Sequence, residues 1–314
     1  MTLSKKHSEK IKAAALQCGF DAAGITKAEI PENHAIYFTR WLEEGMHADM
    51  TYMDKRCEMR LHPQKLFPGV KSVIVLLKSY YRHDLPDKPD HKIARYATGK
   101  DYHKRLKKKM QKLQKSVREI TNMDFTSRPF VDSAPVLERS LAVKAGLGWI
   151  GKNTCLIHPG LGSYVFIAEL FTDLELPGDT DTVKNHCGNC TRCIDACPTH
   201  ALSEKGLDAG RCISYHTIES KGDIPGGIKN ALNGWVFGCD ICQEVCPHNH
   251  KTLKRTNTDP DFMPGEHLAF VNLDYLSKID DEQFKKTFAG TPLMRAGRTK
   301  LLKTLKAPKT GGNQ

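Results

Sequence analysis

The sequence has no long hydrophobic run and no apolar segment near its N-terminus. Its longest uninterrupted apolar stretch, Val73–Leu77, has five residues, whereas a membrane-spanning helix needs about 20. Lys5 and Lys6 are not followed by the apolar core of a secretory signal, so we expect a cytoplasmic protein that does not enter a membrane. Disulfides are rare in the cytoplasm, and the 11 cysteines therefore need another explanation.

Acidic residues are fewer than basic ones. The 314 residues include 47 Lys and Arg against 36 Asp and Glu, which gives a formal net charge of +11. Hydrophobic residues make up 39% and charged residues 26%, which excludes a disordered chain and fits one large or two medium domains. The positive charge is uneven, because residues 100–118 hold nine Lys or Arg against one Asp.

Hydrophobic periodicity predicts a mixed α/β arrangement in the first half of the chain. Apolar residues at helical spacing predict a helix over residues 5–18, and apolar runs predict strands at 71–81 and 165–171. A second helix is predicted around residues 104–118, with apolar residues on one face and Lys and Arg on the other. That basic face is either an ordinary solvated surface or a surface that binds phosphate groups.

Eight of the 11 cysteines lie between residues 187 and 246, and seven of them form two runs that each end in Cys-Pro. The first run, CGNCTRCIDACP at residues 187–198, has the spacing of bacterial ferredoxins, in which three close thiolates hold one cluster and the fourth reaches a second. The second run, CDICQEVCP at residues 239–247, lacks one close cysteine. Cys212 lies between the runs and is the remaining candidate in this region.

The eight cysteines match the number of thiolates that two 4Fe–4S clusters need. Crossing the ligands between the runs assigns the first cluster to Cys187, Cys190, Cys193 and Cys246. The same crossing assigns the second cluster to Cys197, Cys239, Cys242 and Cys212. Zinc and buried free thiols are the alternatives, although zinc sites do not call for a C-x2-C-x2-C-x3-C-P string.

Two further motifs carry residues that an ordinary core does not need. VDSAPVLER at residues 131–139 places an acid in an apolar, turn-forming context, and AGLGWIGKN at residues 145–153 is glycine-rich, so that its backbone could approach a large ligand. Together with CGNCTRCIDACPTHAL, RCISYHTIE and FGCDICQEVCP, in this order, these motifs closely resemble the epoxyqueuosine reductase family. The resemblance spans roughly residues 5–250.

The resemblance implies an oxidoreductase that performs the last step of queuosine biosynthesis, the reduction of epoxyqueuosine to queuosine in the anticodon loop of tRNA. It implies cobalamin and two 4Fe–4S clusters as cofactors, supplied by a low-potential electron donor that the sequence does not identify. The implied fold is α+β. It places a mixed α/β cobalamin-binding domain, similar to that of reductive dehalogenases, at residues 1–177, a two-cluster ferredoxin-like domain at 178–250 and a basic, helical C-terminal segment at 251–314.

The resemblance also implies roles for individual residues. Asp132 takes the place of the family's proton donor, and the eight cysteines match the family's cluster ligands in the crossed arrangement. The residues implied to line the cobalamin cleft are Cys57, Tyr96, Asp132, Asn153, His158, Ser214 and Asp240. His158 is assigned to the pocket only, because cobalamin in this family is expected without a histidine ligand to cobalt.

Two of these residues have alternative interpretations. A carboxylic acid that donates a proton near neutral pH requires an apolar environment, so we expect Asp132 to be buried beside the corrin. The alternative is that Asp132 caps a helix that begins at Ser133 or Pro135. Three basic residues flank Cys57, which predicts a lowered pKa for its thiol; the alternative is an incidental thiol.

Two other functions compete with this one. A related corrinoid reductase of a small molecule, such as a halogenated compound, usually carries a twin-arginine export signal, which this sequence lacks. A ferredoxin-like electron carrier would need only the Cys-rich region, although about 180 residues precede it. Many family members continue with C-terminal helical repeats that help to hold tRNA, and this chain ends at Gln314, before the full extension. We therefore expect tRNA binding to depend more on the basic helix and the C-terminal segment.

Overall fold

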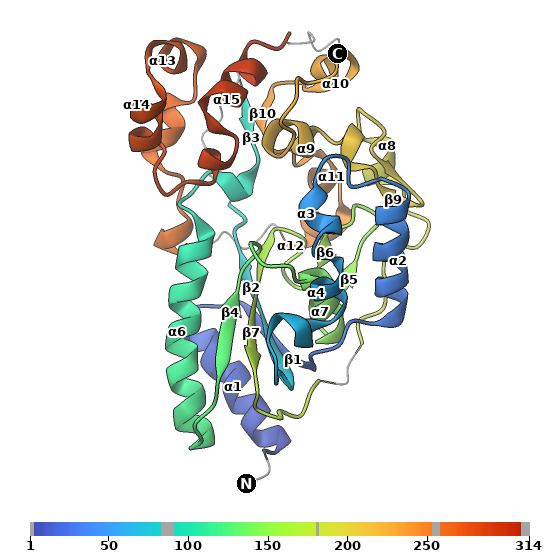
Figure 1. The fold of residues 1–314 in the computed structure, drawn as a ribbon, viewed down its shortest axis with the longest axis vertical. Coiled ribbons are helices and arrows are strands. Elements are labelled where there is room, and N and C mark those ends of the chain that lie inside the picture. Colours follow the sequence, from blue (N-terminus) through green and yellow to red (C-terminus); the bar gives the residue numbers. More distant parts are fainter. Residues whose placement is uncertain (1–2, 83–90, 180–181, 253–257, 309–314) are drawn as a thin grey trace. The chain divides into compact units, whose positions relative to one another are not determined.

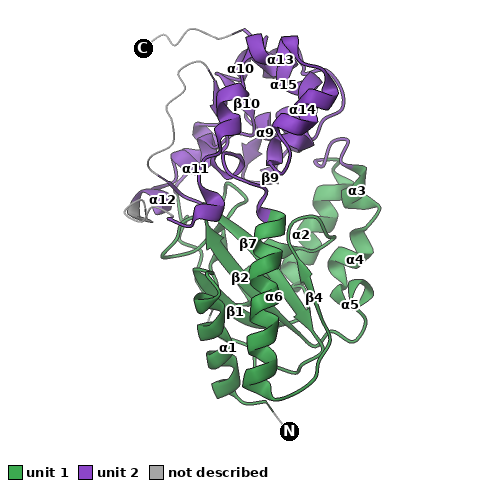
Figure 2. Ribbon diagram, turned by 90° about the vertical axis from the view of Figure 1, so that its left-hand side faces the viewer, with its two compact units in different colours: residues 1–45, 51–79, 103–189 green, residues 46–50, 80–102, 190–314 purple. Residues whose placement is uncertain are grey.

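The computed structural model describes residues 3–82, 91–179, 182–252 and 258–308 (Figure 1). It divides into two compact units, each discontinuous in sequence (Figure 2). Unit 1 comprises residues 1–45, 51–79 and 103–189, and unit 2 comprises residues 46–50, 80–102 and 190–314. The predicted mixture of helices and strands is confirmed. Within the described ranges, no helix combines the length and the apolar character that crossing a membrane requires.

Unit 1 is built on a four-stranded antiparallel sheet with the strand order β1–β2–β7–β4 (Figure 1). Its strands are β1 (Ala22–Lys27), β2 (Ser72–Ser79), β4 (Ser127–Phe130) and β7 (Val165–Thr172). The central strands β2 and β7 confirm the two strands that the apolar runs predict. Both are almost fully buried, because helices pack on the two faces of the sheet.

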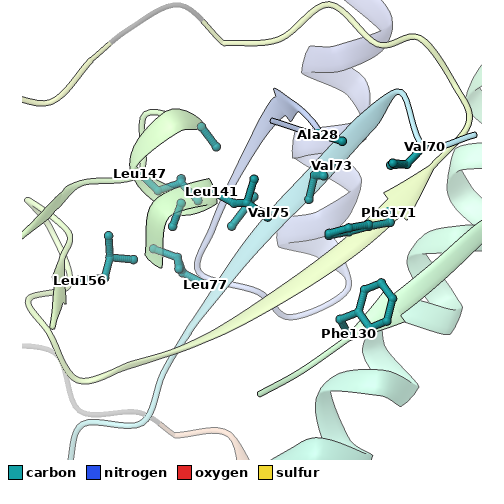
Figure 3. Close-up of a cluster of buried hydrophobic side chains, with 12 residues drawn as sticks. Ala28, Val70, Val73, Val75, Leu77, Phe130, Leu141, Leu147, Leu156 and Phe171 are labelled. Carbon is teal, nitrogen blue, oxygen red and sulfur yellow. The ribbon is translucent and has the colours of Figure 1, made fainter. Parts of the chain in front are cut away.

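One face of the sheet packs against α7 (Glu138–Lys144), and α1 (Lys5–Gln17) and α6 (Tyr102–Thr121) cover the other (Figures 1 and 2). On the α7 side, side chains of β2 and β7 meet Leu141 and Ala142 in a hydrophobic cluster (Figure 3). Helix α6 buries its apolar face and exposes several lysines on the opposite one. The helices predicted over residues 5–18 and 104–118 are thereby confirmed.

Shorter elements complete unit 1. They are α2 (Glu32–Glu43), α4 (Cys57–Leu61), α5 (Pro63–Leu66), β5 (Trp149–Ile150) and β6 (Leu156–Ile157), with α3 (Thr51–Asp54) preceding α4. Strands β5 and β6 form a hairpin within the glycine-rich region. Gly148 has a φ of +150°, and a Cβ atom there would lie 2.2 Å from the carbonyl oxygen of Ile157. The glycine is thus required for packing within the hairpin, and its approach to a large ligand stays a prediction.

Unit 2 holds most of the Cys-rich region and the C-terminal helices. The strands β3 (Lys92–Ile93) and β10 (Trp235–Phe237) pair in parallel, and β8 (Leu202–Ser203) pairs with β9 (Gly206–Leu207). The α-helices are α8 (Arg192–Asp195), α9 (Ile213–Ile218), α10 (Gly226–Ala231), α11 (Ile241–Glu244), α12 (Pro247–Thr252), α13 (Leu273–Lys278), α14 (Asp281–Thr287) and α15 (Gly297–Leu305). The 3-10 helices are η1 (Arg95–Ala97), η2 (Ala209–Arg211), η3 (Pro260–Phe262), η4 (Glu266–Phe270) and η5 (Pro292–Arg295).

The C-terminal helices share a core with the strand that precedes the second cysteine run. Val236 and Phe237 of β10 pack with Leu276 of α13, Phe284 of α14 and Leu301 of α15. The described part of the predicted C-terminal segment is therefore a packed part of unit 2. The predicted division at residues 177 and 250 stays a prediction, because the compact units combine segments from different parts of the chain.

Candidate active site

Asp132 lies in the loop between β4 and α7, in a backbone conformation that few residues adopt. Its φ is +52°, in the left-handed region that Asp tolerates better than most residues. The N–H of Ser133 donates to the carbonyl oxygen of Val131 at 2.5 Å, which folds the loop tightly around Asp132. The N–H of Asp132 itself donates to Oε1 of Glu138, also at 2.5 Å. The first residue of α7 therefore holds the loop that presents Asp132.

The carboxylate of Asp132 is exposed. Its side chain keeps 60% of its accessible surface, and its Oδ2 lies 3.7 Å from Nε2 of His103 on α6. The expected burial of Asp132 is therefore wrong for this structure. The alternative role as a helix cap is wrong as well, because α7 begins at Glu138 with Leu137 as its N-cap residue. Since exposed ion pairs contribute little stability, the backbone and not the carboxylate fixes the position of Asp132.

Two further carboxyl groups lie close to this loop, and sequence reasoning singled out neither of them. Glu169, on β7, is fully buried; burial raises its pKa well above the ordinary value, and the neighbouring Glu138 raises it further. Burial likewise raises the pKa of Glu138 to about 8, and the charge of Asp132 adds to this rise. The signal that could have revealed the pair was an acidic residue inside the apolar run VFIAELF.

A cavity of about 460 Å³ in unit 1 is lined on one side by residues 133–135 of the Asp132 loop. Three cationic side chains also line it, those of Arg56, Lys107 and Arg128. Lys107 comes from the basic helix α6, and Arg128 comes from β4. Among the described residues, no acidic side chain contributes to the lining. The charge of the cavity therefore favours an anion, such as a phosphate group.

Cys57 is the first residue of α4 and is half-buried. Burial raises the pKa of its thiol, Glu58 and Asp54 raise it further, and Arg60 opposes them. The lowered pKa that the flanking basic residues predict is therefore wrong. The prediction fails because burial and the nearby acids raise the pKa of the thiol more than the positive charge of Arg60 lowers it. Arg60 is itself buried, with 7% of its surface exposed. The place of Cys57 in a cobalamin cleft stays a prediction.

The hairpin β5–β6 positions Asn153 and His158. Asn153 is buried, and its Oδ1 accepts the N–H of Cys155 at 3.2 Å. Nδ1 of His158 accepts the N–H groups of Gly160 and Leu161 at 3.0 and 3.1 Å. Burial lowers the pKa of His158, and the two hydrogen bonds favour a neutral ring with its proton on Nε2. His158 thus stabilises the turn after β6, and its assignment to the cobalamin pocket stays a prediction.

Three of the cysteines predicted to bind the second cluster interact with one another in unit 2. Burial raises the pKa of Cys239, and the thiols of Cys212 and Cys197 raise it further. The pKa of Cys212 is raised mainly by burial, with an additional effect of Cys197. Three thiols from distant points of the sequence thus gather in one region, as the ligands of a single cluster must.

Backbone N–H groups also point at these sulfur atoms. The N–H of Ala201 donates to Sγ of Cys197 at 3.3 Å. The first turn of α9 donates to Cys212, and the first turn of α11 donates to Cys239. N–H donors and helix N-termini stabilise thiolates, and hydrogen bonds to sulfur also tune the potential of a cluster. The donor chemistry of this region therefore fits an iron–sulfur cluster.

The remaining cluster cysteines are distributed over both units. Cys193 lies in α8 and Cys242 in α11, while Cys187 belongs to unit 1, where its N–H donates to Oδ1 of Asn185 at 2.9 Å. Across the described ranges, no three His, Cys, Asp or Glu side chains are arranged around one metal-ion position. This is compatible with 4Fe–4S clusters, because each cysteine binds a different iron atom. The assignment of each cysteine to a cluster stays a prediction.

Three predicted cobalamin contacts lie next to these cysteines in unit 2. Asp240 follows Cys239 and is buried, and its Oδ2 accepts the N–H of Arg95 at 2.7 Å. Burial raises the pKa of Asp240 to about 7. Tyr96 follows Arg95 in η1, and Ser214 lies in the first turn of α9. The other predicted contacts belong to unit 1, and the assembly of the whole set into one cleft stays a prediction.

Comparisons with known proteins show the family. A family model described as epoxyqueuosine reductase QueG matches residues 60–133, and a model of a 4Fe–4S double cluster binding domain matches residues 186–249. The second match confirms the iron–sulfur prediction for the Cys-rich region. A curated epoxyqueuosine reductase of Leadbetterella byssophila is 44% identical over 289 residues, which cover 90% of this chain and 93% of that protein.

Solved structures agree with the sequence relatives. A crystal structure of epoxyqueuosine reductase with an epoxyqueuosine-modified stem loop of tRNA-Tyr has a TM-score of 0.85 and 28% identity, covering 96% of this chain and 80% of that one. A structure of epoxyqueuosine reductase from Bacillus subtilis, whose catalytic aspartate loop is swung out of the active site, has a TM-score of 0.82 and 27% identity over 96% of this chain and 80% of that one. These matches confirm the resemblance of the motifs, and the chain belongs to the epoxyqueuosine reductase family.

Proposed function

We propose that this chain reduces epoxyqueuosine to queuosine in tRNA in the cytoplasm, with Asp132 as the proton donor. The observation that carries the proposal is the position of Asp132 on a tightly folded loop whose next three residues line a cationic cavity. Two comparisons support it. One relative of known structure binds an epoxyqueuosine-modified tRNA stem loop, and another carries a catalytic aspartate loop.

The proposed reaction converts an epoxide into an alkene and releases the oxygen atom as water. It consumes two electrons and two protons. Side chains do not supply electrons at low potential, so redox cofactors must do so. Opening the strained ring leaves an alkoxide, which is a poor leaving group until it is protonated. A general acid within hydrogen-bond reach contributes about 10²–10⁴-fold, and Asp132 is the residue that we assign to this role.

The eight cysteines would hold two 4Fe–4S clusters in the crossed arrangement, loaded by a low-potential donor. Thiols with backbone N–H donors around Cys197, Cys212 and Cys239 support this assignment. The residues that would hold cobalamin are Cys57, Tyr96, Asn153, His158, Ser214 and Asp240. When bound, cobalamin supplies a strongly reducing cobalt centre able to open the epoxide. Because Nδ1 of His158 already accepts two backbone hydrogen bonds, we assign His158 to the pocket wall.

We assign the tRNA backbone to the basic face of α6. The exposed lysines on this helix are Lys104, Lys108, Lys112 and Lys115. Lys107 lines the cavity beside the Asp132 loop. Lys contacts to phosphate position a nucleic acid without reading its sequence. The modified base would then leave the stack of the anticodon loop to reach Asp132, as enzymes that modify a base require.

Anaerobic reconstitution with iron, sulfide and cobalamin tests the proposal. Incubated with a reductant and tRNA that carries epoxyqueuosine, the loaded protein should form queuosine, which mass spectrometry detects as the loss of one oxygen atom. Formation should require both kinds of cofactor. A visible spectrum recorded before tRNA is added reports corrinoid binding. A protein that takes up clusters but no corrinoid, or that is fully loaded and leaves epoxyqueuosine unchanged, would contradict the proposal.

A further inference from the structure

We propose that Glu138 and Glu169 act together as positioning residues for Asp132. Their carboxyl groups share a proton, and the carboxyl group of Glu138 holds the loop by accepting the backbone N–H of Asp132. The inference rests on the proposed function, because it assigns the pair a part in the reduction. It adds to that function a second layer of residues, which do not touch the substrate and act through Asp132.

Glu169 stands on the face of the sheet that packs against α7. Side chains alternate along a strand, so Glu169 shares its face with Phe171, a member of the hydrophobic cluster shown in Figure 3. It pairs in register with Val75 of β2 and with Phe130 of β4, and 0% of its surface is exposed. A carboxyl group in such surroundings is costly unless it is protonated and hydrogen-bonded.

The group available to share this proton is Glu138. Within the described ranges, neither carboxyl oxygen of Glu169 has a hydrogen-bond partner. Glu138 begins α7, which packs on the same face of the sheet, and its carboxyl group raises the pKa of Glu169. Two neighbouring carboxyl groups, one of them fully buried, do not both ionise. The pair therefore keeps at least one proton at neutral pH. A proton of Glu169 donated to Glu138 leaves the other oxygen of Glu138 to accept the N–H of Asp132.

The charged groups that face the pair come from several elements. Asp132 adds negative charge from its loop, while Arg139 of α7 and Arg60 of α4 add positive charge. His103 of α6 faces Asp132. Burial and the charge of Asp132 outweigh the positive charges and raise the pKa of Glu138 to about 8. Above that pH Glu138 loses its own proton, and we expect the Asp132 loop and the turnover of the enzyme to change with it.

The first test measures hydrogen exchange of the Asp132 amide in the cofactor-loaded full chain before tRNA is added. Glu138→Leu removes the acceptor and keeps most of the volume, so this amide should exchange about tenfold faster or more, as expected when one hydrogen bond is lost. Glu138→Gln keeps an acceptor oxygen and should stay close to the wild type. Glu175→Gln, at an exposed acid of the same unit, is the control. Unchanged exchange in Glu138→Leu would overturn the positioning role.

The second test measures the pH dependence of kcat on tRNA and does not depend on the folding of Glu138→Leu. Glu169→Leu keeps the burial of the side chain but removes the carboxyl group that donates to Glu138. Because this hydrogen bond lowers the pKa of Glu138, Glu138 should ionise at higher pH. The alkaline limb of the profile should move up by about one pH unit or more, and an unmoved limb would overturn the shared proton. If the exchange results hold but the wild type itself does not reduce the tRNA, the proposed function fails while the positioning of Asp132 stands.

Discussion

The buried carboxylate of Asp240 accepts a hydrogen bond from the backbone N–H of Arg95 at 2.7 Å. Gln243 donates to the other oxygen of the same carboxylate at 3.3 Å. Because Arg95 begins η1, which carries Tyr96, one side chain joins a predicted cobalamin contact to the residue that follows Cys239. The structure of the second cysteine run and the position of Tyr96 are therefore coupled within unit 2.

Asp240→Ala should remove this link between the second cysteine run and the helix that carries Tyr96. The N–H of Arg95 would lose its acceptor in the interior, which should lower the free energy of unfolding by about 1–3 kcal/mol and reduce the iron retained after gel filtration. Urea unfolding followed by circular dichroism measures the first effect, and an iron assay measures the second. Asp240→Asn keeps an oxygen for Arg95 and is the matched control; an equal loss of stability in both variants would show that this hydrogen bond is not the cause.

Cys212→Ser should cost the protein one of its two clusters. The thiol of Cys212 interacts with those of Cys197 and Cys239, and a serine hydroxyl is a poorer ligand for iron than a thiolate. After anaerobic reconstitution, the iron content should fall from about eight to about four atoms per chain. Cys18→Ser, at a thiol that faces Lys109 and Lys112 of α6, should keep the full content. A full iron content in Cys212→Ser would mean that another residue is the fourth ligand of the second cluster.

Long elements were predictable from the sequence, whereas the details of the site were not. Strands β2 and β7 contain continuous apolar runs, and helix α6 has apolar residues at helical spacing over its whole length. Such long patterns identify an element from the sequence alone. Helix α8 has four residues, which is too short for any periodicity. The exposure of Asp132 depends on one backbone angle and on a contact with Glu138, neither of which leaves a pattern in the sequence.

The pKa of Cys57 shows the same limit. Neighbours along the chain suggested a positive environment, but folding turns Arg60 inward and leaves Glu58 and Asp54 to act on the thiol. The charge that a side chain experiences depends on burial and on directions that only the fold determines. Glu169 was missed for a related reason, because the face of β7 that it occupies becomes interior only when α7 packs on the sheet.

Replacing Lys108, Lys112 and Lys115 by Gln should weaken tRNA binding without changing the reduction of a short substrate. All three side chains are exposed on α6, and each phosphate contact that is lost should lower the slope of log K against log salt by about 0.7–0.9. Fluorescence titrations of labelled tRNA at several salt concentrations measure this slope. Lys205→Gln, at an exposed lysine of unit 2, is the control. A slope equal to that of the wild type would remove α6 from the RNA interface.

Asp132→Asn should leave the fold and the cofactors in place and slow the reduction by about 10²-fold or more. Asn also tolerates a positive φ and keeps the N–H that donates to Glu138, so the loop should hold its shape. Single-turnover formation of queuosine measures the rate, and the visible spectrum confirms the loading. Asp124→Asn, at an exposed acid before β4, should react like the wild type. Near-normal turnover of Asp132→Asn would mean that another group donates the proton to the alkoxide.

Stability should fall as the pH rises through the range in which the buried acids titrate. An acid whose pKa is raised by folding keeps its proton in the folded chain after the unfolded chain has lost it. For Glu138 this range runs from the ordinary value of 4.5 to about 8. Within it, each such group lowers the free energy of unfolding by up to about 1.4 kcal/mol per pH unit; the penalty is absent below the range and complete above it.

Glu169→Gln should therefore flatten this dependence and make the protein more stable than the wild type near pH 8, because the fully buried acid whose pKa folding raises is gone. Urea unfolding at a series of pH values measures the two curves. Glu175→Gln, which removes an exposed carboxylate, should follow the wild-type curve. Parallel curves for Glu169→Gln and the wild type would mean that burial does not hold a proton on the pair, since a shared proton has to appear as a difference in slope.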